Sequence, residues 1–568
     1  MKVVSETYGN RQGDLERARF VDLVTKLKDG RSNLFGVCFA LAVGLAWINR
    51  FVQDDAFISF RYARHLAEGS GLVWNIGERV EGYTNFLWTL CLTPAFLFGW
   101  DPVLYSYTLS LMAYVCTLGI CYWLASWLWR NWKAGLLCVI LLATNFSFSS
   151  YATGGLETQF GIAWVLATVA ALAYWQCYPQ RMGAGIGAGV TSACAVMTRM
   201  DAVLLLVPFW LGATWRILCM RSCRSQRALS LAIGTAVLPV AGWLVWRHMY
   251  YGTWVPNTFL IKSAGVSWIR GAYYVALFYA VYGLWLFFPI CWRNGRQSEK
   301  NPLVVELFTA WFLWQCYVIG IGGDFMEFRM MMPGLPFFMI VLSFCLLRLK
   351  RRLFILSIGI LVVCSSLQDV CQPAYPCVDS IKKLKSQIVE WRNVADELTG
   401  ILRNKESGAI KIGITCAGVI PFYTDAPCLD LLGLNDVDVA KKGARIQSLN
   451  RWLGNRPGHV VMAQWRQVLD KKVHLLVNTP WMFKLPTDGE LLPLKADEVI
   501  RCWYWGKGWN DQRVSAAMVP FRAIEGYGKP IVVAWPCGKG KYLITLYVKR
   551  DPVIDQAIVR CHATVVNE

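Results

Sequence analysis

The stretch FVQDDAFISFRYARHL, residues 51–66, decides how the chain is interpreted. It follows an apolar run at 33–51 that is long enough to cross a membrane, and it begins with two adjacent carboxylates, Asp54 and Asp55. After them, polar and apolar side chains recur on separate faces at helical spacing. The pattern predicts a membrane-spanning helix that is followed by an amphipathic helix lying against the bilayer surface.

The composition is that of a membrane protein with many spans. Of the 568 residues, 55% are hydrophobic and only 17% are charged, whereas soluble domains are about one quarter charged. The net charge of +20 would also suit nucleic acid, but much of the excess lies in short loops. The positive-inside rule accounts for Lys and Arg in such loops. We therefore expect the lipid bilayer as a partner and no nucleic acid.

Eleven apolar segments are predicted to span the membrane. They lie near 33–51, 103–129, 134–150, 158–177, 183–199, 202–219, 228–247, 271–291, 303–321, 332–349 and 353–368. The apolar stretch 85–99 is too short to span and is predicted to lie along the membrane surface. With this threading, the basic clusters fall on one side, the cytoplasmic one. The opposite side receives DDAFISFRYARHL, YATGGLE, TRMD, YYGTWVPNTFLIK and GGDFMEFR.

The predicted fold class is a polytopic α-helical membrane protein with a C-terminal soluble α/β-like domain. We expect a cytoplasmic N-terminus at 1–32, a transmembrane domain at 33–368 with a long first external loop at 52–102, and an external soluble domain at 369–568. In the soluble domain, 382–403 has the spacing of an amphipathic helix. Short β-branched segments predict strands at IKIGIT, HLLVN, IVVAW and KYLITLYV.

The adjacent acids Asp54 and Asp55 have three interpretations. Aspartate is favoured at the start of a helix, so the pair could be a solvated cap. Two carboxylates beside an aromatic, arginine-bearing loop also suit a general base or a divalent-cation site. The residues by themselves leave these alternatives open.

The other external loops also carry ionisable or polar groups. Ionisable groups at membrane depth are costly and therefore indicate function. Any one of them alone would be a helix cap or a snorkelling side chain, but together they predict a cavity with acids for chemistry and cations for an anionic ligand. The candidates for substrate contact are Arg61, Glu157, Arg199, Asp201, Asn257, Lys262, Asp324, Glu327 and Arg329.

The sequence contains no P-loop, no GxGxxG after a strand, no HExxH and no GxSxG. A cytosolic nucleotide-linked substrate therefore has no support. We expect an activated substrate that is bound to a lipid and reached from the external side.

The stretch DDAFISFRYARHLAEGSGLVWNIGERVEGYTNFLW resembles the first external loop of the polyprenyl-phosphate-sugar glycosyltransferases of the GT-C fold. It is similar in particular to the terminal arabinofuranosyltransferase of mycobacterial arabinan and its proteobacterial relatives. The resemblance continues in order through SYATGGLET, TRMDAVLLL, YYGTWVPNTFLIKSA, GGDFMEFRMMMPGLP, AGVIPFY and LDLLGLND. It departs at Met200, where relatives often carry proline.

The resemblance implies transfer of a sugar, D-arabinofuranose, from a polyprenyl-phosphate donor. The reaction would take place at the periplasmic face of a bacterial inner membrane, on a glycan or on a protein such as a pilin. The resemblance implies that an acid of the first external loop is catalytic. In this sequence that acid would be Asp54 or Asp55, with a slight preference for Asp54. Arg329, Lys262 and Arg199 would contact the phosphate. Asp324 would be a second acid near the sugar.

No metal ligand is assigned, and if a divalent cation takes part, Asp54 and Asp55 are the candidates to hold it. The alternative functions are a transporter or flippase of lipid-linked sugars and a non-catalytic sensor. Transporters usually carry broken helices in two related halves, and no such repeat is visible in the sequence.

Overall fold

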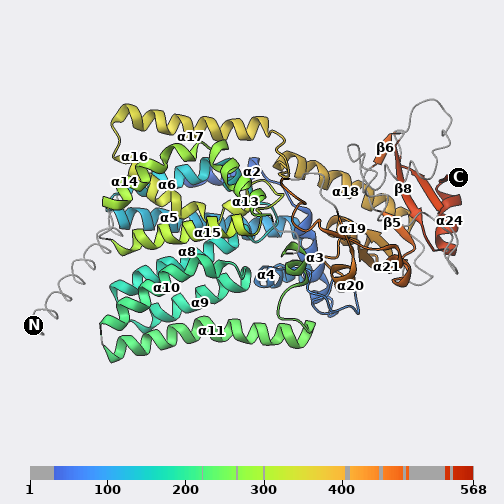
Figure 1. Cartoon of the computed structure of the whole chain (residues 1–568), viewed down its shortest axis with the longest axis horizontal. Coiled ribbons are helices and arrows are strands. Elements are labelled where there is room, and N and C mark those ends of the chain that lie inside the picture. Colours follow the sequence, from blue (N-terminus) through green and yellow to red (C-terminus); the bar gives the residue numbers. More distant parts are fainter. Residues whose placement is uncertain are drawn as a thin grey trace, which may run out of the picture.

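The computed structural model describes residues 31–220, 222–263, 267–297, 301–402, 410–446, 452–477, 482–484, 531–537, 541–549 and 551–566. A long bundle of helices forms one part of the molecule, and a smaller part with a sheet adjoins one end of it (Figure 1). We call the elements from α18 (Ile381–Ile401) to β9 (Thr564–Val566) the C-terminal domain.

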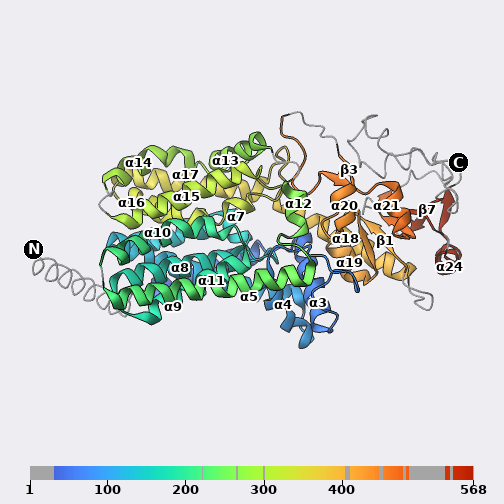
Figure 2. The ribbon, with the colours of Figure 1, turned by 60° about the horizontal axis from the view of Figure 1, so that its bottom comes forward.

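The bundle is built from helices, most of which are apolar and run along its length (Figures 1 and 2). They are α2 (Arg31–Ile48), α5 (Pro102–Trp129), α6 (Trp132–Thr144), α8 (Thr158–Cys177), α9 (Met182–Thr198), α10 (Ala202–Cys219), α11 (Cys223–Tyr251), α13 (Trp268–Val281), α14 (Phe288–Gln297), α15 (Pro302–Gly320), α16 (Leu335–Leu347) and α17 (Arg351–Cys371).

Six of the described helices are long and apolar enough to cross a membrane, or seven if the pair Trp268–Val281 and Leu284–Asn294, bent by 80°, is one span. Several shorter apolar helices accompany them, among them Trp132–Thr144 and Met182–Thr198. The protein is therefore a multi-pass membrane protein, as expected. The number of eleven spans stays a prediction.

Two helices of the segment 52–102 lie where the bundle meets the C-terminal domain (Figure 2). α3 (Asp54–Ala67) occupies the predicted amphipathic segment, and α4 (Phe86–Leu97) occupies the short apolar stretch. The expected position of α3 against the bilayer is wrong. Phe57 and Phe60 belong to the apolar cluster of the bundle, whereas Ile58 and Tyr62 belong to that of the C-terminal domain. The helix is buried between the two parts because both of its faces have partners.

The C-terminal domain combines a long helix with a mixed sheet. α18 (Ile381–Ile401) forms in the segment predicted as an amphipathic helix. All four predicted strand segments form strands, namely β1 (Ile412–Ile414), β5 (Leu475–Val477), β7 (Ile531–Pro536) and β8 (Lys541–Tyr547). In the described part the sheet has the order β2-β1-β5-β8-β7-β9, with β6 also paired to β8.

The remaining strands and helices of this domain are short. β1 runs parallel to its neighbours β2 and β5, and the other pairs are antiparallel. The bounds are β2 (Cys428–Asp430), β6 (Met482–Lys484), β9 (Thr564–Val566), α19 (Val419–Thr424), α20 (Val437–Lys442), α21 (Trp465–Asp470) and α24 (Pro552–Arg560), with β3 (Ala444–Arg445) paired to β4 (Val461–Met462). The domain boundaries expected from the sequence remain a prediction.

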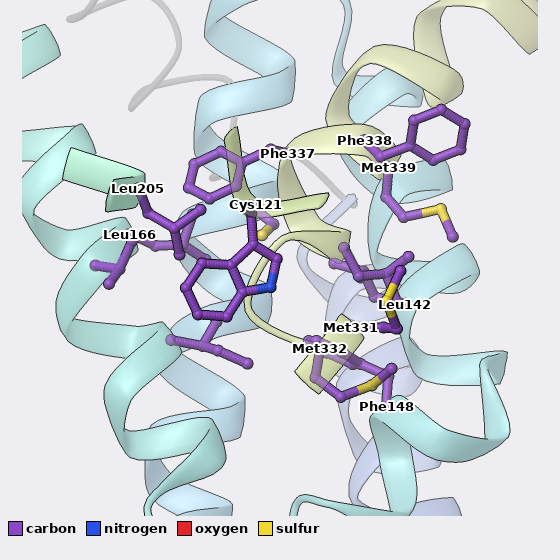
Figure 3. Packing of buried hydrophobic residues seen from close by; sticks show 14 of the residues in the cluster. Cys121, Leu142, Phe148, Leu166, Leu205, Met331, Met332, Phe337, Phe338 and Met339 are labelled. Carbon is purple, nitrogen blue, oxygen red and sulfur yellow. The ribbon is translucent and has the colours of Figure 1, made fainter. Parts of the chain in front are cut away.

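The core of the bundle fixes one of the charged loops. Met331 and Met332, two and three residues after Arg329, lie among the buried side chains of the bundle, close to Leu142 and Phe148 (Figure 3). Flexible thioether side chains fill irregular gaps in a core well. Because the two methionines are buried, the backbone that carries Arg329 is anchored at the end of the bundle.

Candidate active site

A pocket lies beside α3 and has about 440 Å³ of free space, its open mouth included. Its walls come from six separate segments of the chain: Asp55, Ile58, Ser59, Gly82, Tyr83, Thr84, Asn85, Leu156, Glu157, Thr258, Lys262, Arg329 and Leu434. Four of the charged residues predicted from the sequence, Asp55, Glu157, Lys262 and Arg329, thus meet in one cavity.

The YATGGLE loop reaches the pocket because it packs closely against the start of α3. The carbonyl of Gly154 accepts a hydrogen bond from the backbone N–H of Gln53 at 3.1 Å. Gly155 has φ +73°, and a Cβ atom there would lie 2.8 Å from the Cβ of Ala56. Only glycine suits this backbone and this approach. The contact places Glu157, two residues later, in the pocket wall.

Glu157 is a fully partnered carboxylate. It accepts hydrogen bonds from Asn85 Nδ2 at 2.9 Å and from Arg199 at 2.8 Å. Burial acts to raise its pKa, but the charges of Arg199 and Arg329 outweigh burial and hold the pKa below its ordinary value. Asn85 is itself held, because its Oδ1 accepts from Ser59 at 3.2 Å. Glu157 is therefore an ionised hydrogen-bond acceptor rather than a base.

Arg199 and Asp201 lie behind Glu157 and do not line the pocket. Arg199 donates to both carboxylate oxygens of Asp201, at 2.9 and 2.5 Å, in addition to Glu157. Asp201 also accepts from the hydroxyl of Tyr317 at 3.0 Å. The guanidinium of Arg199 is thus engaged by two acids and supports the pocket wall.

The cations of the pocket are Lys262 and Arg329. Lys262 makes no ion pair with any residue that the structure describes. Arg329 pairs through Nε with Asp324 Oδ2 at 3.0 Å, and Asp324 Oδ1 accepts from the backbone N–H of Phe325 at 2.8 Å. Asp324 is outside the lining and orients Arg329, so its predicted position next to a sugar has no support from the geometry.

The two adjacent acids have different surroundings. Asp55 lines the pocket and accepts no hydrogen bond from the described residues. Asp54 faces the C-terminal domain, where it accepts from the backbone N–H groups of Val419 at 2.8 Å and Gly418 at 3.2 Å. Burial raises the pKa of Asp54 to about 7. Of the pair, only Asp55 presents a free carboxylate to the cavity.

The pair does not fit a metal site. Divalent cations such as Ca²⁺ need several oxygen ligands, and the carboxylate of Asp54 is occupied by Gly418 and Val419. Within the described ranges, no group of three or more His, Cys, Asp or Glu side chains is arranged to hold an ion.

Three further predicted residues lie outside the pocket and join the bundle to the C-terminal domain. Arg61 is buried and donates to the carbonyls of Trp74, Pro421 and Ala426. Asn257 donates to the carbonyl of Gly433. The side chain of Glu327 accepts from the backbone N–H of Ile381, the first residue of α18, at 2.8 Å. Burial raises the pKa of Glu327.

The uncharged residues of the pocket were not predicted from the sequence. These are chiefly Ser59, Tyr83, Asn85, Thr258 and Leu434. Charged side chains stand out because charge near lipid is costly, and uncharged side chains carry no such cost. The only available signal was their place inside the quoted motifs, such as EGYTNF and LDLLGLND.

Comparison with known proteins gives matches in sequence and in fold. A family model described as "Domain of unknown function (DUF8728)" matches residues 383–515. A terminal beta-(1->2)-arabinofuranosyltransferase of Corynebacterium glutamicum is 28% identical over 344 residues, 52% of this chain and 48% of the relative. Its counterpart from Mycobacterium tuberculosis is 28% identical over 350 residues, 53% of this chain and 52% of the relative. The chain thus spans about half the length of the curated relatives it matches.

Solved structures show the same arrangement of elements. The apo structure of ArnT from Cupriavidus metallidurans matches with a TM-score of 0.54 and 12% identity, over 80% of this chain and 94% of ArnT. ArnT bound to undecaprenyl phosphate matches with a TM-score of 0.53 and 12% identity, over 70% and 86%. The chain therefore has the GT-C fold of ArnT and is similar in sequence to terminal arabinofuranosyltransferases, as the motifs of its external loops predicted.

Proposed function

We propose that the protein is a membrane glycosyltransferase that moves a sugar, D-arabinofuranose, from a polyprenyl-phosphate donor to an acceptor hydroxyl. The observation that carries the proposal is the pocket itself, in which the free carboxylate of Asp55 lies together with the cations Lys262 and Arg329. The names of the relatives support the sugar and the reaction. The undecaprenyl phosphate bound to ArnT supports the class of donor.

Asp55 acts as the general base. It takes the proton of the acceptor hydroxyl while the acceptor oxygen bonds to the anomeric carbon of the sugar. The bond between that carbon and the phosphate oxygen breaks, and its electron pair leaves with the polyprenyl phosphate. Asp55 is preferred over Asp54, because the carboxylate of Asp54 is engaged by Gly418 and Val419.

Lys262 and Arg329 stabilise the charge that develops on the departing phosphate. Fixed cations in a partly enclosed site stabilise such charge strongly, because they need little reorganisation during the reaction. Arg329 is held by Asp324 through Nε, which leaves the rest of its guanidinium for the ligand. Lys262 has no competing ion pair among the described residues.

Glu157 and Asn85 form the polar wall that meets the sugar. Both side chains are locked by hydrogen bonds, with Asn85 between Ser59 and Glu157. A preorganised acceptor and donor pair of this kind orients the hydroxyl groups of a sugar. The acceptor is a glycan or a protein such as a pilin, and the sugar transfer occurs at the periplasmic face of a bacterial inner membrane.

Transfer is favoured over transport. A transporter places its binding site near the middle of the bilayer, whereas this pocket contains residues of α3 and of the C-terminal domain, which lie at one end of the bundle (Figure 2). The basic connections α10–α11 and α16–α17 lie at the opposite end (Figure 1). Under the positive-inside rule, this arrangement supports a position of the pocket on the external face.

The proposal is tested with the full-length protein in lipid nanodiscs, labelled polyprenyl-phospho-arabinose and candidate acceptors. Asp55→Asn is expected to lower the rate of transfer by about 10²–10⁴-fold, the usual effect of removing a general base, while undecaprenyl phosphate still binds. Asp54→Asn, which keeps an oxygen acceptor for the N–H of Val419, is the matched control and is expected to retain most of the activity.

The possible outcomes separate the parts of the proposal. Unchanged transfer by Asp55→Asn would contradict the assignment of the base. A wild-type protein that accepts other lipid-linked sugars but not arabinose would contradict only the choice of sugar. Absence of transfer from every lipid-linked donor to every acceptor would contradict the glycosyltransferase function.

A further inference from the structure

The helix α12 (Asn257–Ser263) carries Thr258 and Lys262 into the pocket. A helix of seven residues has little stability of its own in water. Its position is therefore determined by the groups that hold it, and those groups come from two other parts of the chain.

Asn257 at the start of α12 joins these two parts. Its backbone N–H donates to the carbonyl of Glu81 in the first external loop at 3.0 Å. Its buried side-chain Nδ2 donates to the carbonyls of Gly433 and Leu434 in the C-terminal domain, at 2.7 and 3.0 Å. One residue thus fixes α12 to both walls of the pocket, because Gly82 and Leu434 are themselves lining residues.

Both attachment points are rigid. Glu81 forms a fully buried ion pair with Arg247 of α11, with Nε to Oε2 at 2.9 Å. On the other side, the carboxylate of Asp430 accepts from the backbone N–H of Leu432 at 3.0 Å and of Asn435 at 2.9 Å. The turn that receives the side chain of Asn257 is therefore held in shape by the C-terminal domain.

The far end of α12 is enclosed by the same domain. Ile261 packs with Val460 and Val461 in a small buried cluster. A Cβ atom on Gly458 would lie 3.8 Å from Lys262 Cε and 3.8 Å from Leu434 Cδ2, so the backbone there runs alongside the lysine stem. The C-terminal domain thus limits the directions in which the Lys262 ammonium can point.

We propose that Asn257 is a positioning residue for the donor phosphate. By tying α12 to Gly433 and Leu434, it holds the ammonium of Lys262 toward the phosphate, so that the phosphate site is complete only when the C-terminal domain is docked. The inference rests on the proposed function, in which Lys262 contacts the phosphate of a polyprenyl-phosphate donor.

The test measures binding of undecaprenyl phosphate to the full-length protein in nanodiscs. Four variants are compared: Lys262→Gln, Asn257→Asp, the double variant and Ser263→Ala. Asn257→Asp keeps the shape of the side chain but turns an oxygen toward the two carbonyls, while the backbone bond to Glu81 remains. If Asn257→Asp does not fold, Asn257→Ala, which introduces no charge, takes its place in the comparison. Ser263→Ala alters an exposed side chain of the same helix and is the matched control.

Lys262→Gln is expected to raise the Kd about tenfold, the order of one charge-assisted hydrogen bond. Asn257→Asp is expected to have a similar effect, and the double variant is expected to bind no more weakly than Lys262→Gln. Such non-additivity is the signature of one residue that acts through another. In transfer assays, Asn257→Asp is expected to raise KM for the donor and also to lower kcat, because the Lys262 ammonium that it positions contacts the phosphate both in the bound donor and as it departs.

Two results would overturn the inference while leaving the proposed function intact. One is unchanged binding by both Asn257 variants, and the other is a double variant whose loss equals the product of the two single losses. If Lys262→Gln itself binds like the wild type, the phosphate site of the proposed function is wrong, and the inference is overturned with it.

Discussion

The adjacent residues Asp54 and Asp55 show how one helical step separates two identical side chains. Neighbouring residues on an α-helix point about 100° apart. At the start of α3 this rotation directs Asp55 into the pocket and Asp54 toward the N–H groups of Gly418 and Val419. The first carboxylate after the membrane span is thus a contact between domains, and the second is free for chemistry.

The raised pKa of Asp54 predicts that stability depends on pH. Burial raises this pKa from 3.8 to about 7 in the folded protein, so between these two values the folded state binds more protons than the unfolded state. The free energy of unfolding should therefore fall as the pH rises from about 4 to about 7. Asp54→Asn, which stays neutral, should flatten this dependence in unfolding experiments at pH 5, 6 and 8. An unchanged slope in the variant would assign the pH dependence to other groups.

At the scale of elements, the close packing of loop and helix determines the pocket wall. The YATGGLE loop touches α3 at Gly155, where a side chain has no room and the backbone has a positive φ. The segment Arg329–Met332 is fixed by methionines in the bundle core (Figure 3). Both charged walls are therefore anchored by apolar or backbone contacts rather than by the charges themselves.

Gly155→Ala should destabilise the protein and impair transfer together. The added methyl group would lie 2.8 Å from the Cβ of Ala56 at φ +73°, and such overpacking costs about 1–3 kcal/mol. We expect a lower melting temperature and slower transfer, because Glu157 shifts with the loop. Gly234→Ala in α11, where a Cβ has open space, is the control and should melt no lower than the wild type. Equal melting temperatures for both variants would contradict this close packing.

At the scale of the whole molecule, the pocket depends on the docking of the C-terminal domain. Arg61 of α3 contributes to this docking through the carbonyls of Pro421 and Ala426, and Arg456 of the C-terminal domain pairs with Asp379 at 2.7 Å. Leu434 is the residue by which the domain enters the pocket itself.

Arg61→Met should loosen this docking. The substitution removes the hydrogen-bond donors of buried carbonyl groups. Each buried carbonyl left without a partner lowers stability by about 1–3 kcal/mol. Hydrogen exchange should become faster for the amides of α19 and of the 426–435 segment, while the bundle helices keep their protection. Arg50→Lys, at an exposed position whose side chain contacts Trp47 in the same turn, serves as the control. Unchanged exchange in Arg61→Met would show that docking does not depend on this arginine.

The orientation in the membrane is a separate prediction for the whole molecule. Alkaline phosphatase, which is active only outside the cytoplasm, should be active when fused after the last residue. The same enzyme inserted in the α16–α17 connection, next to Arg348 and Lys350, should be inactive, since basic loops remain in the cytoplasm. The reverse pattern would place the pocket on the cytoplasmic face.

The sequence by itself determined the class of the protein and most of its local structure. Apolar length gave the membrane helices, helical spacing gave α3 and α18, and β-branched segments gave β1, β5, β7 and β8. These features depend on neighbouring residues, so periodicity and composition reveal them. Four residues of the charged loops also meet in the pocket, and their contact with a substrate stays a prediction.

Only the tertiary structure decided which charges are free. Asp54 meets Gly418 across 364 positions of the chain, and Arg61 meets Pro421 across 360. These contacts turned two predicted site residues into parts of the domain interface, and they left Asp55, Lys262 and Arg329 facing the cavity. A local sequence pattern shows that a side chain is charged. Its partner belongs to a distant segment that only folding brings close, and nothing in the local pattern identifies that partner.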